Sequence, residues 1–162
     1  MKKLYVEETQ MRTKLNKELN LAIKSQNKIR VSTLRLINAA IKDRDISIRT
    51  DENASGVKDE VIVEILMQMI KQRKDSITHY EEGGRLELAE KENIEIEIIK
   101  EFLPKQLSDE EVLIAIKKVI KVENATTIRD MGSVIGRLKR EYVGKMDFSR
   151  VAPLVKEILL TN

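Results

Sequence analysis

Residues 101–111 read EFLPKQLSDEE, and this stretch decides how the chain is organised. Pro104 has no backbone N–H and disfavours helical geometry in the residue before it, so a helix that arrives here must end near Leu103. Ser108 can cap a new helix, and Glu111 can supply the other half of a capping box. A helix stop that is followed within a few residues by a helix start predicts a joint between two packed bodies.

The composition predicts an all-α protein with an aliphatic core. Of the 162 residues, 41% are hydrophobic but only 3% are aromatic, and there is no Trp. The chain has only two Pro and six Gly among abundant Leu, Ile, Glu and Lys, a composition that favours helices. Together with the joint at Pro104, this composition predicts an N-terminal four-helix unit, residues 1–103, and a small C-terminal three-helix domain, residues 104–162.

Apolar residues at helical spacing predict seven helices. We expect the first five near residues 9–25, 26–45, 58–82, 86–102 and 109–123. Thr127 with Asp130 could cap the sixth helix. Either Asp147 or Ser149 starts the seventh. Pro153 lies late for a first-turn proline, so it could kink this helix or delay its start.

The third predicted helix carries one charged residue that needs an explanation. At about 100° per residue, Arg73 lies near the middle of its apolar face. A guanidinium there must extend outward along its stem or meet a carboxylate or backbone carbonyls. Arg73 therefore either pins two helices together or lines a groove as a cation. After this helix, Gly83 and Gly84 are expected to turn the chain through left-handed conformations.

The residue types exclude several kinds of chemistry. The absence of Cys excludes disulfides, thiolate metal sites and cysteine nucleophiles. With His79 as the only histidine, the sequence has no dense cluster of metal ligands. No nucleophile elbow or phosphate-cradling glycine loop is present. We therefore expect a protein without catalytic residues, metal or cofactor.

The hydropathy pattern indicates where in the cell we expect the protein. No apolar run approaches the roughly 18 residues that a membrane span needs. Lys2 and Lys3 resemble the start of a signal peptide, but no apolar segment follows them. We therefore expect a cytoplasmic protein with no membrane partner.

The formal net charge of +3 is unevenly distributed. Residues 12–50 hold ten Lys and Arg against three Asp and Glu, whereas residues 51–103 hold seven against fourteen. Residues 104–162 hold eleven against eight. A basic stripe can attract nucleic acid, but a solvated helix face has the same composition, and both interpretations stay open here.

The best candidate for a functional site is a set of cations at the end of the sixth helix and in the turn after it. Long cations near the start of a helix, where backbone amides are unpaired, suit phosphate oxygens, although cations near a helix end also satisfy the helix dipole. The set consists of Arg137, Lys139, Arg140, Lys145 and Arg150.

Two further features could support this site. Gly132 and Gly136 lie four apart on the sixth helix, and each costs up to about 1 kcal/mol relative to Ala. They leave a notch that serves either close helix packing or close approach of a ligand backbone. On the second helix, Lys28, Arg35 and Lys42 lie at sevenfold spacing and form a secondary basic ridge.

Four segments occur in order along the chain: KQRKDS at residues 71–76, LPKQLSDEE at 103–111, DMGSVIG at 130–136, and Gly144 with Lys145. Together these segments resemble the YqeY family. The resemblance extends from about Leu15 to Leu160. It implies an all-helical protein in two parts, whose second part is a GatB/YqeY-like domain. That domain is similar to the tail of one subunit of the tRNA-dependent amidotransferase, a carbon–nitrogen ligase that takes its amide nitrogen from glutamine.

The resemblance makes tRNA the expected partner. Gly132, Gly136, Gly144 and Lys145 match motif positions of the tail domain, whereas Phe148 stands where relatives often have Gly. The resemblance thus implies a non-catalytic tRNA-binding accessory module. The alternative is a protein-interaction adaptor that docks on an aminoacyl-tRNA synthetase or an amidotransferase, and an enzyme of the amidotransferase type is a third hypothesis. The oligomeric state stays open.

Overall fold

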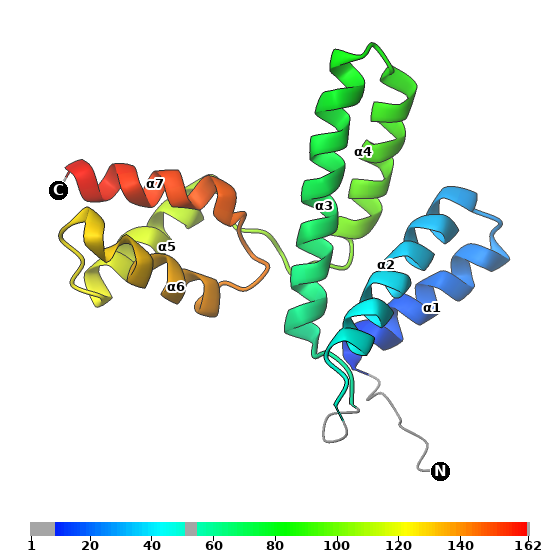
Figure 1. Ribbon diagram of the computed structural model, residues 1–162, viewed down its shortest axis with the longest axis horizontal. Helices are drawn as coiled ribbons and strands as arrows, with labels where there is room; N and C mark the ends of the chain where they lie inside the picture. The colour runs from blue at the N-terminus through cyan, green and yellow to red at the C-terminus, as the bar shows by residue number, and fades with distance from the viewer. Residues whose placement is uncertain (1–8, 51–54, 162) are drawn as a thin grey trace. The chain divides into compact units, whose positions relative to one another are not determined.

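The computed structural model describes residues 9–50 and 55–161 of the chain, and these residues are all-α (Figure 1). They form seven α-helices and one short 3₁₀ turn, and no β-strand occurs within these two ranges. The predicted all-α fold class is therefore confirmed. The chain divides into two compact units, Met1–Leu103 and Pro104–Asn162, and each is described here by itself.

The first unit contains four helices in two hairpins. These are α1 (Gln10–Lys24), α2 (Lys28–Ser47), α3 (Asp59–Glu82) and α4 (Leu86–Lys100). Thr9 and Asn27 cap α1 and α2 by accepting the backbone N–H of the residue three positions later. The core between the hairpins is aliphatic, as its composition predicted. Its fully buried side chains are Leu15, Leu34, Ile37, Ile62, Leu66 and Ile99.

The turn between α3 and α4 differs from the prediction at one residue. Gly84 has a left-handed φ of 68°, but Gly83 has a φ of −83°. One left-handed residue is sufficient here, because the Arg85 N–H then donates to the Tyr80 carbonyl at 2.7 Å and satisfies an orphan acceptor at the helix end. The prediction that both glycines are left-handed was wrong for Gly83.

Arg73 lies between α3 and α4. Its Nε donates to Glu95 Oε2 at 3.0 Å, and one terminal nitrogen donates to the Met69 carbonyl at 3.2 Å. The Glu95 residue is only 7% exposed, so the guanidinium neutralises a carboxylate that has little access to water. Of the two roles that the sequence allowed, helix pinning or a groove cation, the contacts of Arg73 fit the first, because they join α3 to α4.

A second ion pair, which is half-buried, joins α1 to α2. The Arg12 guanidinium donates to both carboxylate oxygens of Asp45, at 3.0 and 2.8 Å, and the Val57 N–H donates to Asp45 Oδ1 at 2.8 Å. Burial works to raise the pKa of Asp45, but the hydrogen bonds from Arg12 and Val57 outweigh it and lower the pKa below its ordinary value.

This lowered pKa predicts an acid-sensitive contribution to stability. Because the folded-state pKa of Asp45 lies below its unfolded value of about 4, the contribution is present above the unfolded pKa and is lost as the pH falls through the folded-state pKa. Replacing Asp45 with Asn should lower the free energy of unfolding at neutral pH by about 1–3 kcal/mol. It should also flatten the acid limb of stability against pH in urea titrations. An unchanged acid limb would contradict the assignment.

The second unit contains three helices and the 3₁₀ turn. These are α5 (Asp109–Val122), η1 (Ile128–Asp130), α6 (Met131–Glu141) and α7 (Phe148–Thr161). The capping box that starts α5 is confirmed, since Ser108 Oγ accepts the Glu111 N–H at 3.2 Å and Glu111 Oε2 accepts the Ser108 N–H at 2.8 Å. The core of this unit is also aliphatic, and its fully buried side chains are Ile116, Val119, Val134, Leu138, Val151 and Val155.

The start of α7 resolves an alternative that the sequence left open. Asp147 precedes the helix, and its Oδ1 accepts the Ser149 N–H at 3.0 Å, so Asp147 and not Ser149 starts α7. Pro153 lies inside this helix, which continues through it to Thr161. Pro153 therefore does not delay the start of the helix.

Candidate nucleic-acid interface

One face of α6 brings together four of the predicted site residues. Val134 and Leu138 are completely buried and fix which side of α6 faces the core. At about 100° per residue, the opposite side of the helix carries Gly132, Gly136, Lys139 and Arg140. Three of these residues are exposed and Gly136 is half-buried. We call these four residues the α6 face.

Among the described residues, none packs closely enough on the two glycines of the α6 face to require the absence of a side chain. A methyl group added at Gly132 would meet no heavy atom within 4 Å, and one added at Gly136 would meet only the Arg140 side chain, at 3.8 Å. Close helix packing therefore does not explain why two residues unfavourable to helices occur one turn apart. They leave a strip of accessible helix backbone beside two cations.

Arg137 differs from the cations of the α6 face. Its Nη1 donates to Glu123 Oε1 at 2.8 Å and its Nε donates to Glu141 Oε1 at 2.7 Å. The hydrogen bonds to Glu123 and Glu141 raise the pKa of Arg137 above its ordinary value. Two carboxylates thus balance its charge, and Arg137 joins α6 to the end of α5. Arg137 is therefore less available to an anionic ligand than the cations of the α6 face.

Gln106 and Leu107, which precede α5, hold the turn between α6 and α7. Gly144 is buried and has a left-handed φ of 68°, which explains why glycine is favoured at this position. Its carbonyl accepts a hydrogen bond from the Gln106 side-chain amide, and the Lys145 carbonyl accepts the Leu107 N–H at 2.8 Å. The Lys145 side chain is exposed.

Phe148, which departs from the family pattern, contributes to the same surface. The Lys139 ammonium lies 6.0 Å from the centroid of its ring, within the range of a cation–π contact. Arg150 lies 3.9 Å from Asp109, but both side chains are mostly exposed, so this ion pair contributes little. In the two ranges that the structure describes, no ion pair involves Lys139, Arg140 or Lys145.

The start of α7 does not offer the unpaired amides that we expected from the sequence. The Ser149 N–H donates to the Asp147 side chain, and the Arg150 and Val151 N–H groups donate to the Asp147 carbonyl at 3.1 Å. Asp147 also places a negative charge where an anion would bind. An anionic ligand at this surface must therefore be held by side chains.

The secondary basic ridge lies in the first unit. Lys28, Arg35 and Lys42 are all exposed along α2, with steps of about 10 Å between them along the helix axis. None of the ion pairs found among residues 9–50 and 55–161 includes them. They form a cationic surface of the first unit.

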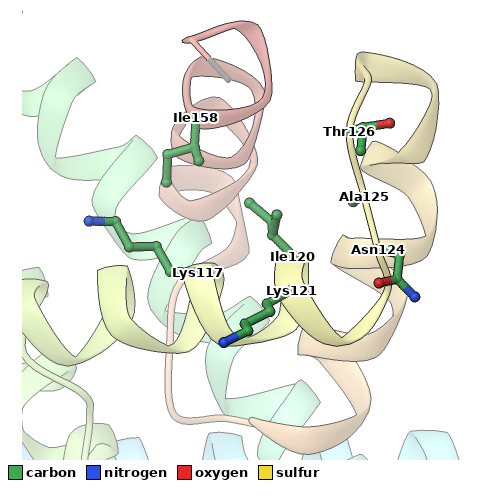
Figure 2. Close-up of a pocket in the computed structure, with 7 residues that line it drawn as sticks. All are labelled: Lys117, Ile120, Lys121, Asn124, Ala125, Thr126 and Ile158. Carbon is green, nitrogen blue, oxygen red and sulfur yellow. The ribbon is translucent and has the colours of Figure 1, made fainter.

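Sequence reasoning missed a pocket of the second unit, of about 400 Å³, shown in Figure 2. Its lining comes from α5, from the segment that follows α5, and from α7: Lys117, Ile120, Lys121, Asn124, Ala125, Thr126 and Ile158. None of the glycines or cations predicted to form the site belongs to it. The width of the apolar arc on α5, which exceeds one helix face, was the signal that could have indicated it.

The sequence as a whole matches one family model, that of the Yqey-like proteins, over residues 12–159. The chain belongs to the YqeY family. Together with the fold, this membership confirms the resemblance found in the sequence motifs.

Individual relatives come from fungi. The altered inheritance of mitochondria protein 41, mitochondrial, of Lachancea thermotolerans is 33% identical over 89 residues, which are 55% of this chain and 46% of that protein. The protein of the same name from Clavispora lusitaniae is 31% identical over 130 residues, 78% of this chain and 71% of the relative. An uncharacterized protein of Schizosaccharomyces pombe is 30% identical over 95 residues, 59% and 73% of the two chains.

This chain spans about half the length of the Lachancea relative, and of the one from Kluyveromyces lactis. Both relatives are named for altered inheritance of mitochondria, and their names describe them as mitochondrial. In the part of this chain that the structure describes, no helix is both long and apolar enough to cross a bilayer.

Proposed function

We propose that this protein is a non-catalytic tRNA-binding accessory module, related to the tail of the glutamine-dependent tRNA amidotransferase. The α6 face and the exposed Lys145 side chain provide the contact surface. One observation carries the proposal: Lys139, Arg140 and Lys145 have no carboxylate partner among the described residues, and the first two adjoin Gly132 and Gly136, where an added methyl group would meet only the Arg140 side chain.

This arrangement suits a sugar–phosphate backbone. Lys and Arg neutralise phosphate charges, and contacts to phosphate oxygens position a protein on a nucleic acid without reading its sequence. A helix surface without side chains lets a bulky RNA backbone come close to the cations. Folded RNA is recognised largely by shape and by its phosphates and 2′-hydroxyls, which suits a surface with few aromatic side chains. The ridge of Lys28, Arg35 and Lys42 would add further phosphate contacts.

A salt titration tests the proposal directly. Fluorescence anisotropy of labelled, unfractionated tRNA should report binding by the full chain, with an association constant that falls steeply and linearly with salt on logarithmic axes. Replacing Lys28, Arg35 and Lys42 with Gln should make this slope shallower. The absence of binding at low salt, or an affinity that does not respond to salt, would overturn the proposal.

The glycines supply a prediction in which stability and binding change in opposite directions. Replacing Gly132 and Gly136 with Ala should raise the free energy of unfolding by up to about 1 kcal/mol each, because Ala favours helix and the added methyl groups meet open space. The same change should weaken tRNA binding, because the methyl groups fill the backbone strip. Thermal unfolding and anisotropy titrations measure the two effects. Lost stability would instead assign the glycines to packing.

The wider role of the module belongs to the same proposal. We place it in the cytoplasm, where it would assist an aminoacyl-tRNA synthetase or an amidotransferase that handles the same tRNA. Association with such an enzyme that survives nuclease treatment would favour the adaptor hypothesis over tRNA binding. Release of ammonia from glutamine by the purified protein would contradict a non-catalytic role, and subcellular fractionation of the tagged protein would test the compartment.

A further inference from the structure

Helix α5 carries more apolar surface than the second unit covers. Val112 and Ile116 are buried, as expected, but Leu113 and Ile114 are 38% and 67% exposed. At about 100° per residue, these two exposed side chains share one side of α5 with Lys117 and Lys121. A helix that is apolar over so wide an arc is usually covered on more than one side.

The pocket of Figure 2 continues this exposed side of α5. Ile120 and Ile158 face the same gap, Ala125 lies beside it, and Lys117 and Lys121 extend outward from α5 one turn apart. The ion pairs within the described residues do not include either lysine. We call Leu113, Ile114, Lys117, Lys121 and this pocket the α5 groove; it is apolar and bordered by positive charge.

The chemistry of the groove indicates an acidic, amphipathic helix as its occupant. Small-molecule sites bury most of their ligand and direct several polar groups at it. This groove is open to solvent, and among its lining residues only Asn124 and Thr126 add neutral polar side chains. A helix brings its own apolar side chains for the pocket, and carboxylates one turn apart would match Lys117 and Lys121.

The first unit of the chain displays such a helix surface. Leu86 and Ile94 of α4 are 66% and 39% exposed, and Glu87 and Glu90 are exposed on the same side of the helix. Neither glutamate takes part in an ion pair with a residue that the structure describes. This α4 face, defined by these four residues, has apolar anchors of its own and the negative charge that complements Lys117 and Lys121.

We infer that two copies of this chain associate, with the α4 face of one copy seated in the α5 groove of the other. The anchors have similar spacings, since Leu86 and Ile94 lie about 12 Å apart along α4, and Leu113 and Ile120, on one side of α5, lie about 10.5 Å apart. Glu87 and Glu90 then lie opposite Lys117 and Lys121. A contact made by one helix and one groove is small, so the association is weak and depends on concentration. It involves neither the α6 face nor bound RNA.

Light scattering on the full chain without RNA tests this inference. The weight-average mass of the wild type should rise above the monomer with increasing concentration and return to it in 1 M NaCl, where the screening length falls to about 3 Å. The double variant Lys117→Glu/Lys121→Glu should stay monomeric at all concentrations. The matched control Lys139→Glu/Arg140→Glu changes the net charge equally on another face, and it should associate like the wild type.

Complementation makes the test specific to the two surfaces. Glu87→Lys/Glu90→Lys should also be monomeric alone, whereas its mixture with Lys117→Glu/Lys121→Glu should associate, because each variant keeps the surface that the other has lost. Ile114→Ser should weaken association without a charge change. All these positions are exposed, and circular dichroism verifies folding. A wild type that stays monomeric, a control that dissociates too, or a mixture that stays monomeric would overturn the inference.

Discussion

Replacing Lys139, Arg140 and Lys145 with Glu is expected to abolish tRNA binding. The change removes three cations that have no carboxylate partner among the described residues and places three negative charges against the phosphates. Like charges brought together cost several kcal/mol, and each 1.4 kcal/mol is a tenfold change, so affinity should fall by at least about a hundredfold at moderate salt. Anisotropy titrations at protein concentrations below any self-association measure the change.

A matched control separates the site from the overall charge. Replacing Lys117, Lys118 and Lys121 with Glu changes the net charge by the same amount, at exposed positions of α5. We expect it to reduce affinity far less than the triple change on α6 and in the following turn. Equal losses would assign binding to net charge alone, and an unaffected affinity in the first variant would remove the α6 face from the interface.

Replacing Arg73 with Ala should have the largest effect on stability. The change leaves the Glu95 carboxylate, which is 9% exposed, without the guanidinium that lies 3.0 Å away in the folded protein. Breaking a buried pair by removing one partner costs about 3–5 kcal/mol. Urea titrations followed by far-ultraviolet circular dichroism should show an earlier transition of the first unit, whereas the transition of the second unit should be unchanged.

The double variant Arg73→Met/Glu95→Met serves as the control. It removes both charges and keeps apolar volume between α3 and α4, so it should recover much of the lost stability. Recovery would show that the isolated carboxylate, and not lost packing of the arginine stem, causes the effect. A loss below about 1 kcal/mol in Arg73→Ala would mean that the pair contributes as little as a surface ion pair.

The elements of the fold were predictable because their signals are local. The capping box of Ser108 and Glu111 and the apolar spacing of α5 need only a few consecutive residues. Helix periodicity placed Arg73 on the inner face of α3 for the same reason. It could not choose between a pin and a groove cation, because that choice depends on Glu95, which lies 22 residues further along the chain.

The candidate site was less predictable because its electrostatics depend on tertiary contacts. Residue types placed Arg137 among the available cations, but the fold sets Glu123 of the preceding segment beside it. Asp147 occupies the Ser149 amide that we had expected to be open to an anion. The free space beside Gly132 and Gly136 also could not be inferred, because the same spacing serves close packing in other helices.

The hydrogen bonds from Gln106 and Leu107 to the Gly144 turn have a practical consequence for studying the second unit alone. The cap at Ser108 marks the first helical turn, and a fragment cut there would retain all three helices. It would nevertheless lose both donors that hold the Gly144 and Lys145 carbonyls. A fragment that starts at Pro104 retains them, so two truncations four residues apart should give nuclear magnetic resonance spectra that differ at this turn.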